Sequence, residues 1–110
     1  MDRLVELGQL LDWYGGFLTP RQAALARQYA FEDCSLSEIA EREGVSRQAI
    51  RDAISRAQIE LSQMEQQLSL IRRTAQTRAI ADEIGSYTQD ERIRGKLQEL
   101  ISLWEDDDGV

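Results

Sequence analysis

Several residue types that carry chemistry are scarce in this sequence. It contains no histidine, one cysteine and one proline in 110 residues. Without histidine it lacks the side chain most often used as a general base near neutral pH. The single cysteine, Cys34, excludes an internal disulfide, and one sulfur with no imidazole cannot make the usual zinc site. We therefore predict no catalytic residue, no metal site and no cofactor, and we do not expect an enzyme.

Long apolar runs are also missing. No stretch approaches the roughly 20 apolar residues that would span a bilayer. No basic segment leads into an apolar run, as it would in a signal peptide. We therefore expect no membrane partner and a cytoplasmic location.

Strand signals are nearly absent, whereas helix signals are abundant. No run alternates β-branched or aromatic residues with polar ones, and long stretches are rich in Ala, Leu, Glu, Gln and Arg. Apolar residues make up 42% and charged residues 30%, which is a globular rather than a disordered balance. We predict one all-α domain over residues 1–110.

Capping and stop signals divide this domain into helices. Thr19 with Gln22, and Ser35 with Glu38, are typical capping boxes at helix starts, and Gly15 with Gly16 ends the first apolar stripe. Thr88 is expected to cap the last helix. The predicted helices cover residues 2–14, 20–31, 36–43, 46–84 and 89–104, and an acidic tail covers residues 105–110.

Residues 36–56 have the pattern of a helix-turn-helix. Ala40 is small enough for two helices to cross closely, and Gly44 tolerates the positive φ of a tight turn. Val45 is expected to fill the corner, and Ser46 to cap the second helix. Three further residues are placed to close a small core, namely Ile39, Ile50 and Ala53.

The second helix of this motif is the candidate DNA reader. Such a helix enters the major groove with its N-terminal residues first, where Arg suits guanine and Gln suits adenine. Residues 46–73 carry five basic and three acidic side chains, whereas both flanking segments are acidic. The predicted DNA-contacting residues are Ser46, Arg47, Gln48, Arg51, Asp52 and Arg56. Because the net charge is −7, binding to RNA or protein, or a purely structural role, stays open.

A heptad seam continues beyond the motif. Apolar residues recur at spacings of four and three from Ile50 to Ala75, a pattern typical of a coiled coil. We therefore predict a homodimer. Its predicted interface consists of Leu61, Met64, Leu68, Ile71 and Ala75 on the seam, together with the last helix. That helix carries an apolar face formed by Ile93, Leu97, Leu100, Ile101 and Trp104. The alternative is that the seam packs inside one subunit against the first and last helices.

Residues 18–22, 35–40 and 44–50 resemble region four of bacterial sigma factors. Together with the opening at residues 10–15 and the long helix to Gly85, they make the chain similar to the YlxM-type family of bacterial proteins, whose genes lie beside those of the signal recognition particle. The resemblance implies a sigma region 4-like, all-helical fold. It also implies DNA binding and transcription regulation through Ser46, Arg47, Gln48 and Arg51, linked to the signal recognition particle pathway. An accessory protein that binds the particle's RNA or protein without reading DNA is the alternative.

Overall fold

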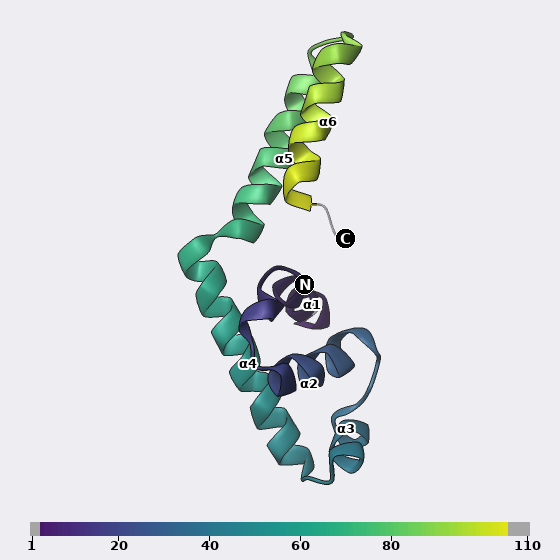
Figure 1. Ribbon diagram of the computed structural model, residues 1–110, viewed down its shortest axis with the longest axis vertical. Helices are drawn as coiled ribbons and strands as arrows, with labels where there is room; N and C mark the ends of the chain where they lie inside the picture. Colours follow the sequence, from purple (N-terminus) through teal and green to yellow (C-terminus); the bar gives the residue numbers. More distant parts are fainter. Residues whose placement is uncertain (1–2, 106–110) are drawn as a thin grey trace. The chain divides into compact units, whose positions relative to one another are not determined.

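The computed structural model describes residues 3–105 and contains only helices in that range (Figure 1). The all-α prediction is therefore confirmed for the described residues. The elements, in chain order, are α1 (Arg3–Tyr14), the 3₁₀ turn η1 (Gly15–Phe17), α2 (Pro20–Phe31), α3 (Leu36–Glu43), α4 (Arg47–Leu68), α5 (Leu70–Ser86) and α6 (Glu91–Glu105). The first predicted residue, Asp2, and the tail beyond Glu105 lie outside the described residues.

The chain divides into two compact units, where the sequence predicted one domain. Of the described residues, 3–69 belong to the first unit and 70–105 to the second. The boundary coincides with a break in the predicted helix 46–84, which is wrong as a single helix. Each unit has its own packed helices, and each is described separately below.

The break lies at Ser69, which has φ 56° and ψ 31° and so occupies the left-handed region. Its backbone N–H still donates to the Glu65 carbonyl at 2.8 Å, so the last turn of α4 closes before the chain leaves the helix. Non-glycine residues rarely adopt this conformation, because the Cβ approaches the carbonyl oxygen. The sequence shows neither glycine nor proline here, and the usual helix-stop signals therefore missed it.

In the first unit, α1, α2 and α3 pack against α4 (Figure 1). The buried face of α4 recurs every three to four residues, as expected for one face of a helix. Its members are at most 5% exposed and are Ile50, Ile54, Ala57 and Leu61. The largest groups buried with them from α1 and α2 are Leu7, Leu10, Leu11, Tyr14 and Leu25. The first half of the predicted seam therefore belongs to the core of one chain.

Two hydrogen bonds join polar groups on α4 to this packing. The Tyr14 hydroxyl, whose residue has no exposed surface, donates to the carboxylate of Glu65. The Gln22 side-chain amide donates to Glu60 at 2.8 Å. Both bonds join residues more than 35 positions apart in sequence, and they satisfy polar groups at the edge of the core.

Both predicted capping boxes are confirmed. The Thr19 hydroxyl accepts from the Gln22 N–H at 3.1 Å, and the Gln22 side chain accepts from the Thr19 N–H at 3.0 Å. Ser35 and Glu38 make the same reciprocal pair at 3.0 and 2.8 Å. The Ser35 backbone N–H, by donating to the Glu38 carboxylate, lowers the pKa of that carboxyl. These boxes fix where α2 and α3 begin.

The second unit is a hairpin in which α5 and α6 pack side by side in opposite directions (Figure 1). Its buried side chains are few, namely Thr74, Ala81 and Ile101. Arg78 on α5 binds Glu105 on α6 through two N–H groups, and this pairing raises the pKa of Arg78 and lowers that of Glu105. The buried core of the hairpin is therefore small and lies along the line where α5 and α6 meet.

The start of α6 differs from the prediction by a few residues. The Asp90 carboxylate accepts from the Arg92 N–H at 2.9 Å and caps the helix, which begins at Glu91 instead of residue 89. The predicted cap, Thr88, instead accepts from the Asp90 N–H at 3.0 Å. Side-chain and backbone hydrogen bonds from Arg92 lower the pKa of Asp90. An aspartate two residues further along replaces the expected threonine, because both side chains can accept from an early N–H.

Truncating Leu61 tests whether this part of the seam is internal. Leu61→Ala is expected to lower the free energy of unfolding of the first unit by about 2–5 kcal/mol, since it leaves a cavity in a packed core. Ile59→Ala, at a residue 56% exposed on the same helix, is the matched control and should change it by less than about 0.5 kcal/mol. Urea unfolding followed by Trp13 fluorescence, in a Trp104→Phe background, measures both variants. Equal effects would show that Leu61 is not a core residue.

Candidate nucleic-acid interface

The turn of the helix-turn-helix is built on Gly44, which has φ 72° and ψ 30°. The Gly44 N–H donates to the Glu41 carbonyl at 3.3 Å, and the Val45 N–H donates to the Ala40 carbonyl at 3.1 Å. These bonds satisfy carbonyls at the end of α3, and glycine adopts this backbone conformation without steric cost. The predicted role of Gly44 is therefore confirmed.

The small core beneath the turn agrees with the sequence except at Val45 and at Ala53, which is only half-buried. Ile39 is 0%, Ala40 5% and Ile50 1% exposed, so α3 and α4 pack closely where they meet. Val45, predicted to fill the corner, is instead 39% exposed. The burial of Ile39 and Ile50 already closes the corner, and the valine follows the left-handed glycine out to the surface.

Helix α4 begins immediately after this turn. The Ser46 hydroxyl accepts from the Ala49 N–H at 3.0 Å, which confirms Ser46 as the N-cap. Its hydroxyl proton is still free to donate outward, because the cap uses the oxygen only as an acceptor. The turn and cap together aim the N-terminal end of α4 away from the core.

All six predicted DNA-contacting side chains are exposed. Residue Gln48 donates to the Asp52 carboxylate at 2.9 Å, which orients both side chains one turn apart. In the part of the chain that the structure describes, Arg47, Arg51 and Arg56 form no ion pair. Three guanidinium groups therefore remain open to an external anion along the first turns of α4.

The acidic side chains of α3 are largely engaged elsewhere. Glu43 pairs with Arg21 at 3.0 Å, and Glu38 is held in its capping box. Arg42 donates to Gln28 at 2.7 Å and lies against the Cys34 sulfur, so it points back to α2. Among the α3 carboxylates of the described residues, Glu41 is exposed and has neither an ion pair nor a capping bond, so α3 contributes one open acidic side chain to the motif.

Comparison with known proteins agrees with this geometry. A sequence model of the UPF0122 family, described as "Putative helix-turn-helix protein, YlxM / p13 like", matches residues 1–101. The chain belongs to the UPF0122 family. A UPF0122 protein of Geobacillus kaustophilus is 37% identical over 103 residues, covering 94% of this chain and 92% of the relative. One from Symbiobacterium thermophilum is 39% identical over 84 residues, covering 76% and 78%. One from Oceanobacillus iheyensis is 33% identical over 103 residues, covering 94% and 98%.

The predicted dimer residues of this UPF0122 chain fall in different environments. Leu61 has no exposed surface and belongs to the core of the first unit, so it is removed from the interface. Met64 and Ile71 are half-buried, and Leu68 and Ala75 are exposed. A heptad count cannot distinguish these cases, because the same spacing serves intramolecular and intermolecular packing.

The second unit of the UPF0122 chain carries an apolar surface that is larger than the sequence predicted. Seven large apolar side chains there are between 42% and 75% exposed, namely Ile80, Ile84, Tyr87, Ile93, Leu100, Leu103 and Trp104. The spacing from Ile93 to Trp104 did predict an apolar face on the last helix, but only Ile101 is buried. The apolar stripe of α6 is therefore wider than the surface that α5 covers, and this width was the feature of the sequence that indicated an exposed apolar face.

Residues 3–105 of this UPF0122 chain contain neither a candidate metal site nor a membrane-spanning helix. No group of three His, Cys, Asp or Glu side chains in that range could hold a metal ion. No helix in the same range is both long enough and apolar enough to cross a membrane.

Proposed function

We propose that this UPF0122 protein is a non-enzymatic DNA-binding regulator of the bacterial cytoplasm, with the N-terminal half of α4 in the major groove. The observation that carries the proposal is the pair of exposed arginines Arg47 and Arg51, which lie about 40° apart around the first turns of α4 and form no ion pair in residues 3–105. Arg56 lies on the opposite side of the helix, beside the line of Gln48 and Asp52. In a chain of net charge −7, the exposed arginines at this end of α4 give an anion a preferred place to bind.

Each side chain has a role that follows from its chemistry. Arg47 and Gln48 lie in the first turn and fit bidentate contacts with guanine and adenine. Asp52 orients Gln48 and can also accept from the cytosine amino group. Ser46 and Arg56 flank this set and suit phosphate oxygens, which fix the register of the helix without reading sequence.

A second candidate function is an accessory role in the signal recognition particle pathway, with particle RNA or protein as the partner. The small number of basic side chains on the motif favours the protein form of this candidate, since three arginines supply a modest electrostatic term for DNA and RNA alike. A-form RNA has a major groove too narrow for side chains to read, so this function needs no base contacts. It predicts equal binding to RNA helices of different sequence.

Replacing Arg47 tests the DNA proposal. Arg47→Ala is expected to weaken duplex binding by about 5- to 150-fold, equivalent to about 1–3 kcal/mol for one lost bidentate base contact. Arg27→Ala removes an exposed arginine from α2 and should leave affinity within about twofold, because it keeps the α4 surface. Fluorescence anisotropy at 50 mM salt measures both variants on a DNA duplex that the wild type selects from a random-sequence pool, and on random-sequence DNA and RNA duplexes for comparison. Tighter binding to RNA, with no dependence on base sequence, would support the second candidate instead.

We also propose that the second unit forms a homodimer. Ile80 and Ile84 on α5, and Ile93, Leu100 and Trp104 on α6, lie about a quarter turn to the same side of the line where the two antiparallel helices meet. They therefore share one face of the hairpin. A second hairpin placed on that face would complete a four-helix bundle and remove these side chains from water.

Dimerisation would also serve DNA binding. A two-fold axis through the bundle would present two copies of α4, which suits a palindromic site. The proposed interface therefore lies on the hairpin and not on the predicted seam. Ile71 and Ala75 lie about half a turn around α5 from Ile80 and Ile84, and Met64 and Leu68 belong to the first unit.

A charge on the apolar face tests the dimer. Light scattering coupled to size exclusion at tens of micromolar should give about twice the chain mass of 12.6 kDa. Ile80→Glu is expected to give the single-chain mass, because it places a charge in an apolar interface. Ile59→Glu changes a residue of nearly equal exposure on α4, 56% against 58%, and should remain dimeric. A wild-type mass of one chain would contradict the proposal.

A further inference from the structure

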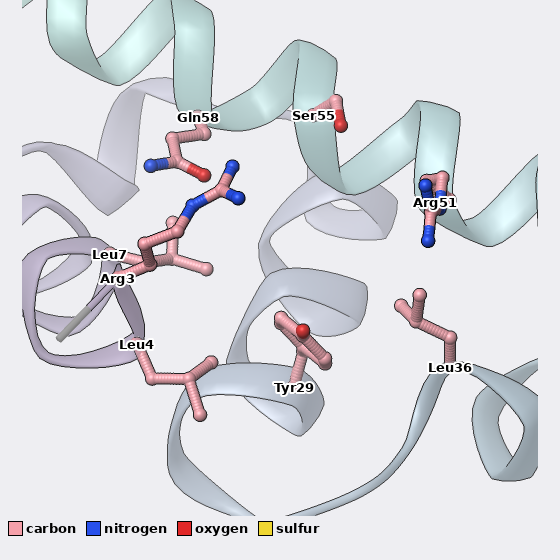
Figure 2. Close-up of a pocket in the computed structure, with 8 residues that line it drawn as sticks. All are labelled: Arg3, Leu4, Leu7, Tyr29, Leu36, Arg51, Ser55 and Gln58. Atoms are coloured by element: carbon pink, nitrogen blue, oxygen red, sulfur yellow. The ribbon is translucent and has the colours of Figure 1, made fainter.

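A cleft of about 230 Å³ lies in the first unit, on one flank of α4. Helices α1, α2 and α4 supply all of its walls except Leu36, the first residue of α3 (Figure 2). Its described lining residues are Arg3, Leu4, Leu7, Tyr29, Leu36, Arg51, Ser55 and Gln58. Its two arginines, Arg3 on α1 and Arg51 on α4, come from helices that are far apart in sequence.

The charge of the cleft is opposite to that of the chain. Two guanidinium groups line it, and none of its described lining residues is acidic, although acidic residues outnumber basic ones by 20 to 13 in the sequence. Among the ion pairs of residues 3–105, none involves Arg3 or Arg51. Two unpaired positive charges on one small cleft make an anion its preferred occupant.

The neutral side chains complete a site for a group that accepts hydrogen bonds. In Figure 2, Arg3 reaches from α1 towards Gln58 on α4, while Arg51 points from α4 towards Leu36. The Tyr29 hydroxyl and Ser55 add further donors between these two ends. Arginine presents a planar fork that matches the oxygens of a phosphate bidentately, and the leucines supply an apolar floor.

We infer that this cleft binds phosphate groups and extends the α4 surface onto α1. Arg51, Ser55 and Gln58 recur at spacings of four and three, so they form one continuous flank that begins inside the helix-turn-helix. Arg51 thus belongs both to the proposed DNA surface and to the cleft, while Arg3 belongs to the cleft alone. The phosphate comes from a nucleic-acid backbone, which rests on the proposed function, or from a free phosphate ester.

Arg3→Gln tests the cleft without touching the helix-turn-helix. If the cleft holds a backbone phosphate, the variant should bind duplex on the order of 5- to 10-fold more weakly at 0.1 M salt, and the slope of log K against log salt should fall by about 0.9. Arg27→Gln is the matched control and should leave both quantities unchanged. Adenosine monophosphate and inorganic phosphate, each added at millimolar concentration, test for a free phosphate by their effect on the melting temperature.

The outcomes separate this inference from the proposed function. If duplex does not bind, but adenosine monophosphate or inorganic phosphate raises the melting temperature of the wild type and not of Arg3→Gln, the cleft stands and takes a free phosphate. If Arg3→Gln binds duplex more weakly than the wild type while Arg27→Gln does not, the cleft holds a phosphate of the nucleic-acid backbone. If duplex binds Arg3→Gln and the wild type equally, and neither small phosphate distinguishes the two proteins, the inference is overturned while DNA binding by α4 stands.

Discussion

Burial of one face of α4 determines how the rest of the first unit is used. The face formed by Ile50, Ile54, Ala57 and Leu61 is covered by the other helices of that unit, and it fixes the rotation of α4 about its own axis. Because a helix turns about 100° per residue, this burial directs Gln48, Asp52 and Arg56 to the opposite, solvent-exposed side. The packing of the core and the composition of the candidate DNA surface are thus two consequences of one pattern.

The turn between α3 and α4 then decides which end of that exposed side meets a partner. Gly44 ends α3 in the left-handed conformation and Ser46 caps α4 directly afterwards, so the N-terminal turn of α4 carries Arg47 and Gln48 at the edge of the unit. The surrounding acidity also has a consequence. In a chain of net charge −7, residues 46–73 carry more basic than acidic side chains whereas both flanking segments are acidic, which favours one orientation of approach for a polyanion.

The sequence predicted local features well, because neighbouring residues determine them. Both capping boxes, the left-handed Gly44 and the Ser46 cap each depend on side chains within four positions. The break at Ser69 was missed because serine is seldom left-handed and no breaker stands beside it. Features that depend on tertiary contacts were less predictable. Leu61 and Leu68 occupy equivalent heptad positions, yet one is buried and the other is 49% exposed, since α1 and α2 pack only along part of α4.

The candidate site was predictable as a set of residues but not as a surface. Spacing alone identified the six side chains at the start of α4, whereas their exposure, the Gln48–Asp52 hydrogen bond and the cleft beside Arg51 depend on how three helices meet.

The central claim is that the first turns of α4 contact nucleic acid. Amide chemical-shift mapping of the ¹⁵N-labelled protein, titrated with a DNA duplex, tests it most directly. We expect the largest shifts in residues 46–56 and little change in α6; unchanged signals in residues 46–56 at saturating duplex would contradict nucleic-acid binding by α4.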